Sequence, residues 1–155
     1  MGIEIIGTGK GLPALSVDNE RLATMVETDN QWIIERTGIE SRYVSTQETG
    51  LSLAAAAARE ALGWTDGGWV REEEKAAGID PESIDLVLVA TCSPDKLVPA
   101  MASMVKLELG LPNAVAFDIN IACSGFVYSS VVAESMMKAG LLFGKAFSTA
   151  NSVKR

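Results

Sequence analysis

Two runs of apolar residues mark the interior of the predicted fold. Residues 85–90 and 114–120 are rich in leucine, valine and isoleucine, a composition typical of buried strands in a parallel sheet. Stretches of helical length follow each run, at residues 99–109 and 124–138, and a less apolar strand is predicted at residues 145–150. This alternation of strands and helices predicts an α/β fold with a parallel sheet.

The first sixty residues have a different pattern, with shorter elements. A short strand is predicted at residues 3–7, and an extended segment at residues 39–46. Asp18 and Asp29 each precede a stretch with helical spacing, where their carboxylates can cap the first turn. The alanine-rich residues 51–62 predict a helix that packs closely against its neighbours.

A cluster of glycines follows the first predicted strand. Gly7, Gly9 and Gly11 invite comparison with a dinucleotide-binding loop, but their spacing is not G-x-G-x-x-G and no helix begins directly after them. Leu12-Pro13 interrupts the chain instead, since the residue before proline disfavours helical geometry. A glycine-rich turn is the favoured interpretation.

Charge and composition exclude several classes of function. The chain has 155 residues, a net charge of −7, two cysteines and no histidine. The acidic balance, without a basic stripe, argues against nucleic-acid binding, and no apolar run approaches the ~18 residues of a membrane span. Two cysteines form neither a metal-ligand spacing nor a disulfide framework, so we expect a cytoplasmic protein without a metal.

Cys123 is the strongest candidate for chemistry. It stands where the strand at 114–120 turns into the helix at 124–138, and free N–H groups at a helix start favour a thiolate nucleophile. The alternative is a small buried core cysteine. Cys92 follows the other apolar strand, but no helix begins directly after it, so we interpret it as structural. Asp118 and Asn120 are expected to hold the strand end.

Trp32 and Arg36 form a second candidate site. They stand four residues apart on a predicted helix and so project from the same side. An indole and a guanidinium can both stack on a flat aromatic ring, which suits a clamp for adenine. A surface cation–π pair that only stabilises the helix is the alternative.

Three segments carry a resemblance to a known family. The sequence Asp-Ile-Asn-Ile-Ala-Cys-Ser-Gly-Phe at 118–126 resembles the active-site segment of β-ketoacyl-acyl-carrier-protein synthase III, a condensing enzyme of the thiolase superfamily. Residues 28–43 are similar to the family signature TxxxWIxxRTGIxxR, and residues 86–95 also match. The resemblance covers the whole chain except residues 63–74 or thereabouts.

The resemblance implies the N-terminal half of the thiolase-like fold. That half has a mixed five-stranded sheet with helices and a central, buried nucleophile helix. Relatives are roughly twice as long, and their second half contributes a catalytic histidine and an asparagine. We therefore expect residues 1–155 to form one half-domain, to lack the C-terminal half, and not to complete the reaction alone.

The resemblance also implies an activity and its site residues. Cys123 would take the acyl group of a short acyl-coenzyme A, which then condenses with malonyl-acyl-carrier protein to start fatty-acid synthesis. Coenzyme A enters as a thioester substrate, and no separate cofactor is expected. Thr28, Trp32 and Arg36 match residues at the coenzyme A entrance. Val98 matches a loop that closes the acyl pocket of the partner subunit in a homodimer.

Other functions stay open at this stage. A sister enzyme of the same fold, making polyketide starters, quinolones or hydroxymethylglutaryl-coenzyme A, would use the same cysteine. A non-catalytic half could bind acyl-coenzyme A without turnover, or serve only as a scaffold.

Residues 63–74 depart from the family pattern. They insert about a dozen residues that carry Trp64, Trp69 and an acidic triplet. A solvated surface insertion is favoured over a surface that contacts a partner.

Overall fold

The computed structural model describes residues 3–65, 68–69, 79–142 and 145–150. It divides into two compact units, a larger one formed by residues 1–11 and 49–153 and a smaller one formed mainly by residues 12–48. Each unit is described by itself below. Within the described residues, no helix is long and apolar enough to cross a membrane.

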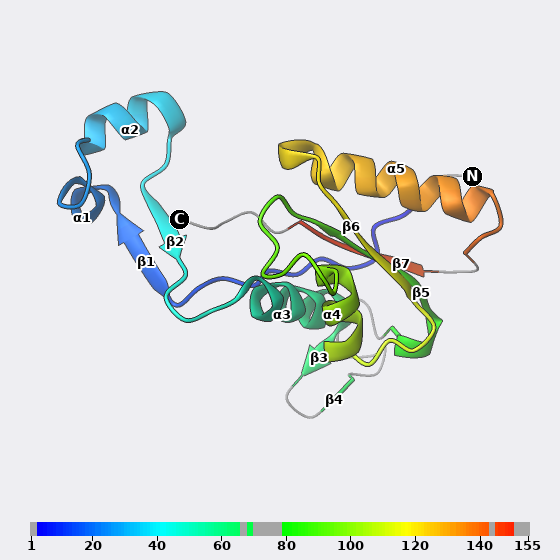
Figure 1. Cartoon of the computed structure of the whole chain (residues 1–155). Coiled ribbons are helices and arrows are strands. Elements are labelled where there is room, and N and C mark those ends of the chain that lie inside the picture. Colours follow the sequence, from blue (N-terminus) through cyan, green and yellow to red (C-terminus); the bar gives the residue numbers. More distant parts are fainter. Residues whose placement is uncertain (1–2, 66–67, 70–78, 143–144, 151–155) are drawn as a thin grey trace. The chain divides into compact units, whose positions relative to one another are not determined.

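A three-stranded parallel sheet forms the centre of the larger unit (Figure 1). Strand β5 (Ile84–Ala90) lies between β6 (Val115–Ile119) and β7 (Lys145–Ala150). At the carboxyl edge of the sheet, Ala90 pairs with Ile119 and with Ala150. The strands predicted from the two apolar runs and from the less apolar residues 145–150 are therefore confirmed, and they are parallel as expected.

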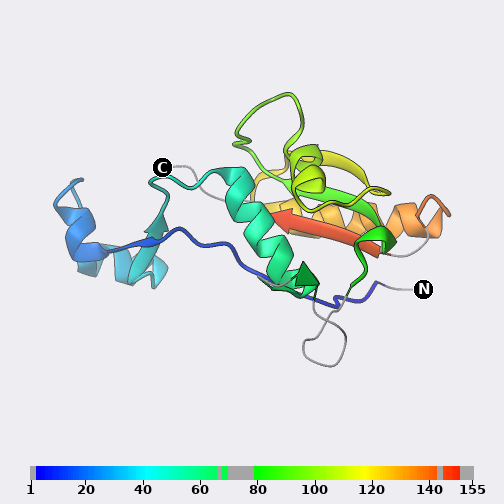
Figure 2. The same ribbon diagram turned by 90° about the horizontal axis from the view of Figure 1, so that it is seen from below.

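Helices cover both faces of this sheet. Helix α4 (Met101–Glu108) connects β5 to β6, helix α5 (Gly125–Lys138) connects β6 to β7, and α3 (Gly50–Leu62) precedes the sheet. Figures 1 and 2 show α5 on one face of the sheet, with α3 and α4 on the other. Successive side chains of a strand point to opposite faces, so the side chains of β5 contribute in turn to a hydrophobic core on each face of the sheet.

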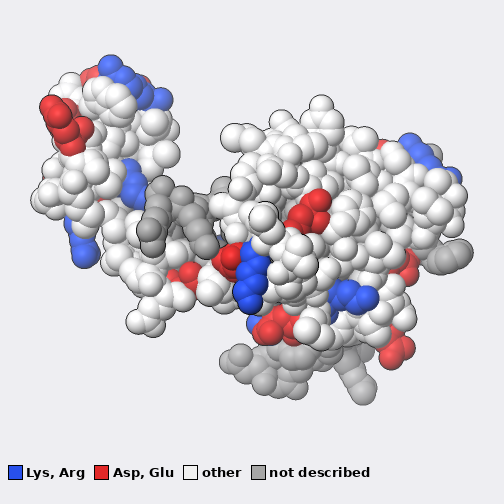
Figure 3. Space-filling view, in the orientation of Figure 1, with Lys and Arg blue, Asp and Glu red and all other residues white. Residues whose placement is uncertain are grey.

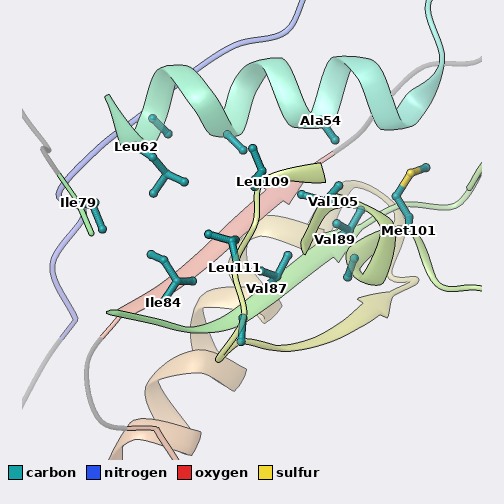
Figure 4. Packing of buried hydrophobic residues seen from close by; sticks show 14 residues of the cluster. Ala54, Leu62, Ile79, Ile84, Val87, Val89, Met101, Val105, Leu109 and Leu111 are labelled. Atoms are coloured by element: carbon teal, nitrogen blue, oxygen red, sulfur yellow. The ribbon is translucent and has the colours of Figure 1, made fainter. Parts of the chain in front are cut away.

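The two cores differ in size. Val87 and Val89 of β5 pack with α3 and α4 in the larger cluster, whose packing is drawn in Figure 4. Leu86 and Leu88 point to the other face and pack in a smaller cluster that includes Ala133 of α5. Because β5 is buried on both faces, its sequence is almost continuously apolar.

The smaller unit pairs two short strands and two helices. Strands β1 (Leu15–Asp18) and β2 (Ser41–Val44) are antiparallel, and helices α1 (Asn19–Ala23) and α2 (Asn30–Thr37) lie between them in the sequence.

The predicted helix caps of the smaller unit are confirmed. Asp18 accepts a hydrogen bond from the Arg21 amide, and Asp29 accepts one from the Trp32 amide, each at 2.7 Å. Gly38 ends α2 with a φ of 69°, a left-handed conformation that glycine adopts without steric cost.

A buried asparagine holds the smaller unit together. The Asn19 side chain is only 1% exposed, and its Nδ2 donates to Asn30 Oδ1 at 2.9 Å and to the Ile39 carbonyl at 2.8 Å. Arg42 donates to Asn19 Oδ1 and also to the Val17 carbonyl. Every polar atom of this amide is thereby used, as burial requires.

The prediction of a strand at residues 3–7 is wrong, because the structure has no strand there. The segment pairs with no described strand, and the residues that follow it, from Gly9 to Gly11, lie against α3 instead. A Cβ on Gly9 would lie 2.1 Å from the Ala57 carbonyl oxygen, and one on Gly11 would lie 2.0 Å from that of Leu53. These glycines therefore allow a close approach of backbone to helix, rather than forming a turn or a nucleotide loop.

Two further expectations need correction. In place of a mixed five-stranded sheet, the described residues contain the three-stranded parallel sheet and two separate antiparallel pairs, β1–β2 and β3–β4. Helix α5 is also not buried on all sides. Gly125, Ser129 and Ala133 face the sheet, whereas the opposite side is exposed, because among the described residues a single sheet packs against this helix.

The 63–74 segment is described only in part. Strands β3 (Trp64–Thr65) and β4 (Gly68–Trp69) form a minimal antiparallel pair, in which Trp64 is opposite Trp69. Residues 66–67 and 70–74 lie outside the described residues. The choice between a surface insertion and a partner surface stays a prediction.

Glu48 offers a pH-dependent test of the smaller unit. Its carboxylate accepts hydrogen bonds from the amides of Ala14 (2.9 Å), Thr46 (3.0 Å) and Gln47 (3.3 Å). These amides, Ala14 first, lower the pKa of Glu48 from 4.5 to about 2. The folded state thus favours the ionised form, so its stabilisation is complete above pH 4.5 and is lost as the pH falls toward 2.

We expect Glu48→Gln to loosen the smaller unit at neutral pH, because an amide group presents only one acceptor oxygen to the three N–H donors. Hydrogen exchange of residues 12–48, followed by mass spectrometry, measures this effect. The difference between variant and wild type should narrow between pH 4.5 and 2. A difference that is equally large at both ends of this range would contradict the assignment.

Candidate active site around Cys123

Cys123 lies at a sharp junction between strand and helix. Strand β6 ends at Ile119, residues Ala122–Ser124 form a short 3-10 turn, and α5 begins at Gly125. Ala122 has a φ of 43°, which places a non-glycine residue in the left-handed region. Strain of this kind concentrates at functional sites, where the surrounding structure holds it in place.

The thiol of Cys123 is exposed, so the alternative of a buried core cysteine does not hold. Hydrogen bonding in the 3-10 turn begins at Ser124, whose amide donates to the Ile121 carbonyl at 3.1 Å. The Cys123 amide precedes this bond, at the start of the helical segment, where N–H groups lack partners within the helix. An exposed thiol and a backbone donor thus belong to one residue, an arrangement that could serve a nucleophile and an oxyanion contact.

The sheet fixes the position of this junction through one close contact. A Cβ built on Gly125 would lie 2.5 Å from the Cβ of Ala90, the last residue of β5. Only glycine allows α5 to begin this close to the sheet. Gly125 is buried, and it follows Cys123 by two residues, so the contact sets where the thiol is presented.

Asp118 holds the carboxyl end of β6 to the neighbouring helix. Its carboxylate accepts hydrogen bonds from the amides of Met101 (2.8 Å) and Ala102 (2.7 Å), the first two residues of α4. These are charge-assisted bonds to N–H groups that have no partner within the helix. The structural role expected for Asp118 is therefore confirmed.

We expect Asp118→Ala to destabilise the larger unit by about 2 kcal/mol, the upper range for loss of a helix N-cap, because two partly buried amides lose their acceptor. Asp118→Asn keeps one acceptor oxygen and should give an intermediate loss. Urea titration of both variants measures the effect. Equal stability of wild type and Asp118→Ala would contradict it.

Asp95 makes an equivalent long-range cap that the sequence pattern did not indicate. It follows β5, and its carboxylate accepts hydrogen bonds from the amides of Gly50 (3.1 Å) and Leu51 (2.8 Å) at the start of α3. The cap joins residues more than forty positions apart in the sequence. The only signal was an aspartate directly after Ser-Pro at the end of a predicted strand.

Trp32 and Arg36 contact one another on α2 of the smaller unit. The Arg36 guanidinium carbon lies 4.6 Å from the centre of the Trp32 ring, and the Trp32 side chain is 51% exposed. Thr28 is half-buried, just before the Asp29 cap. This geometry is compatible with an adenine clamp and also with a cation–π pair that only stabilises the helix. Thr28, Trp32 and Arg36 belong to the smaller unit and Cys123 to the larger one, so their juxtaposition stays a prediction.

Val98 lies in the loop between β5 and α4. Its side chain is 85% exposed and that of Leu97 is 88% exposed, which is unusual for two adjacent aliphatic residues. The structure therefore leaves these side chains available for a contact, and the role of Val98 at a dimer interface stays a prediction.

The outer face of α5 is apolar and uncharged. The exposed apolar side chains of the helix, which we name the α5 face, are Phe126, Val127, Tyr128 and Val131, and Ile121 is exposed just before the helix. No charged residue occurs from Ile119 to Ala133, and beyond that Lys138 pairs with Glu134 at 2.7 Å. Figure 3 shows the surface over most of α5 as uncharged, with charged side chains only toward one end of the helix. A continuous exposed apolar face of this kind marks an interaction surface.

Among the described residues, no group of three or more histidine, cysteine, aspartate or glutamate side chains could hold a metal ion. Cys92 is exposed, like Cys123, so it is not part of the core.

The sequence of the chain is similar to known condensing enzymes. It is 45% identical to the β-ketoacyl-acyl-carrier-protein synthase III of Rhizorhabdus wittichii over 88% of the chain, and 44% identical to one from Vibrio cholerae. The chain resembles one part of this synthase. It spans only 39% and 34% of the length of these two proteins. No family model matches the sequence.

Solved structures of the same synthase show the same fold. The enzyme from Aquifex aeolicus superposes with a TM-score of 0.81 at 36% identity, covering 96% of this chain and 45% of that one. A priming β-ketosynthase from a polyketide biosynthetic pathway superposes with a TM-score of 0.79 at 30% identity, covering 95% and 41%. The fold is thus the thiolase-like α/β fold of these enzymes, over less than half of their length.

Proposed function

We propose that the chain supplies the nucleophile of a β-ketoacyl-acyl-carrier-protein synthase III. The Cys123 thiolate attacks the carbonyl of an acyl-coenzyme A, and coenzyme A leaves as its thiol. Malonyl-acyl-carrier protein then loses carbon dioxide, and the resulting carbanion attacks the acyl group on Cys123. A β-ketoacyl-acyl-carrier protein and the free thiol are the products.

The observation that carries this proposal is the presentation of Cys123. An exposed thiol stands at a helix start behind a residue with a φ of 43°, within a sequence that matches the synthase. The Cys123 amide is one donor for the oxyanion that forms during acyl transfer. A second donor and the base belong to the part of the enzyme that the chain does not span.

The remaining part of the enzyme is the proposed occupant of the α5 face. The matched synthases have a further stretch that is longer than this chain, and we assign to it a histidine and an asparagine for the decarboxylation step. An uncharged face suits this contact, since buried charges without partners are costly. The complex forms a homodimer in which Val98 reaches the acyl pocket of the partner subunit.

Coenzyme A is proposed to bind as a substrate, with its adenine against Trp32 and Arg36 and with Thr28 nearby. The exposed indole supports this assignment, because its free face can stack on a base. No separate cofactor takes part. Two free cysteines fit the reducing cytoplasm, where we place the protein.

Acetylation of the chain by acetyl-coenzyme A tests the proposal. The purified chain is incubated with the thioester, and its intact mass is compared with that of an untreated sample. We expect one acetyl group, and peptide mapping should place it on Cys123. An unchanged mass under conditions where the protein is folded would overturn the proposal for this chain.

A polyketide-priming enzyme is the second candidate, favoured by the match to a priming β-ketosynthase at 30% identity. Both candidates use Cys123 in the same way, so acetylation does not separate them. Preference between carrier proteins of fatty-acid and polyketide synthesis does. A half that binds acyl-coenzyme A without turnover would show binding but no acetyl group.

A further inference from the structure

Both cysteines of the chain stand at the same edge of the same sheet. Strands β5 and β6 are adjacent and parallel, so their carboxyl ends meet, with Ala90 opposite Ile119. Cys92 lies two residues beyond the end of β5, and Cys123 lies four residues beyond the end of β6. Each thiol is free and exposed.

The order of the strands places the two cysteines at the same edge of the sheet. The packing of Gly125 against Ala90 draws the segments that carry them closer together. The two residues touch, with the Gly125 Cβ position 2.5 Å from the Ala90 Cβ. Helix α5 returns from β6 to the parallel strand β7, so it runs opposite to the strands, as Figure 2 shows. Going back from Gly125 to Cys123 therefore leads in the same direction as going forward from Ala90 to Cys92.

The face of β5 that leads toward Cys92 is the face that α5 covers. Leu86, Leu88 and Ala90 of β5 point toward α5, because residues two apart on a strand share a face. The contact between the two strands continues one residue beyond β5, since the Thr91 amide donates to the Ile119 carbonyl at 3.0 Å. The chain next to Cys92 therefore stays beside the end of β6, and it turns at Cys92 and Ser93.

We propose that Cys92 and Cys123 form a reversible disulfide that protects and silences the nucleophile. A disulfide needs Cα atoms about 4.4–6.8 Å apart. The contact between Gly125 and Ala90, each two positions away from a cysteine, holds the two segments that carry the thiols against one another. The chemistry is thiol–disulfide exchange with a small disulfide such as oxidised glutathione. Formation of the disulfide does not depend on the proposed acyl transfer, whereas its silencing effect rests on the proposed function.

The reaction proceeds in two balanced steps. The Cys123 thiolate attacks oxidised glutathione, forms a mixed disulfide and releases one glutathione. The Cys92 thiolate then attacks the Cys123 sulfur, forms the internal disulfide and releases the second glutathione. Two protein thiols are oxidised, two glutathione molecules are formed, and dithiothreitol reverses the sequence.

The test oxidises the full chain with glutathione disulfide and then blocks remaining thiols with iodoacetamide. We expect the wild type to lose both alkylatable thiols, to carry no glutathione, and to yield one peptide pair joined through Cys92 and Cys123. Cys92→Ser removes the second step, so it should stop at a glutathione adduct on Cys123. A wild type that accumulates glutathione adducts, or that forms covalent dimers instead, overturns the proposal.

Unfolded wild type provides a control that needs no variant. In denaturant the two cysteines are separated only by a flexible loop of about 30 residues, whose closure costs entropy. The native chain should therefore form the internal disulfide faster than the unfolded chain at equal oxidant and pH. Equal or slower formation in the native chain shows that the fold does not bring the thiols together.

Discussion

Replacing Cys123 by serine is expected to abolish acetylation of the chain by acetyl-coenzyme A. A serine hydroxyl is not ionised near neutral pH and needs an adjacent base, whereas a thiol reaches its reactive thiolate form far more readily. The chain contains no histidine that could act as this base. Loss of an essential nucleophile costs several orders of magnitude in rate, so no acetyl group should be found within the assay time.

The matched control is Cys92→Ser, which makes the same chemical change at the other exposed thiol. Intact mass and peptide mapping of both variants measure acetyl transfer, and circular dichroism checks that both are folded. We expect the Cys92 variant to be acetylated like the wild type. Acetylation of Cys123→Ser would contradict the assignment of Cys123 as the nucleophile. Equal loss of acetylation in both variants would also contradict it, because the effect would then not be specific to Cys123.

Local signals in the sequence were sufficient for most of the elements. Strand β5 was predictable because burial on both faces demands a continuous apolar run. The starts of α1 and α2 were predictable from Asp18 and Asp29, because a cap acts on amides only two or three residues away. Cys123 was likewise placed correctly at the turn from strand to helix.

Features that depend on distant parts of the chain were not predictable in this way. The segment at residues 3–7 has enough apolar residues for a strand, but a strand forms only where a neighbour offers hydrogen bonds. Gly9 and Gly11 gave the wrong signal, because a glycine required by packing against α3 looks the same in sequence as one required by a turn.

The candidate site shows the same division. The motif Ala-Cys-Ser-Gly indicated the nucleophile, but not that Ala122 adopts a φ of 43° or that Gly125 touches Ala90. The long-range bonds of Asp95 and Asp118 to the starts of α3 and α4 also require the folded arrangement. Sequence reasoning nominated Cys123 as the reactive group, which stays a prediction, whereas the structure shows which contacts hold this segment.

Gly125→Ala adds a single methyl group, and we expect this group to displace Cys123, the proposed nucleophile. The added carbon would lie 2.5 Å from the Ala90 Cβ, a distance that real Cβ atoms essentially never show. Neither carbon can rotate away, because each is bonded directly to the backbone. Helix α5 must therefore move away from the sheet. Overpacking of this kind costs about 1–3 kcal/mol of stability.

The displacement should reduce acetylation more than the loss of stability explains. Cys123 lies two residues before Gly125, and a shift of about 1 Å in a reacting group can cost about 100-fold in rate. We expect Gly125→Ala to remain folded, with a lower urea midpoint and much slower acetyl transfer. Both quantities are measured on the same preparation, so that unfolded protein can be subtracted from the rate.

A second substitution, Ala90→Gly, tests whether the effect of Gly125→Ala comes from the contact between residues 90 and 125. Ala90→Gly removes the methyl group that Gly125→Ala meets, so the double variant restores the space between β5 and α5. A double-mutant cycle should then show a favourable coupling, because each substitution alone is harmful and the pair is less so than their sum. Ala57→Gly, within α3, serves as a comparison for the general cost of glycine, since it does not contact α5. Additive effects of Gly125→Ala and Ala90→Gly would show that this contact does not set the position of Cys123.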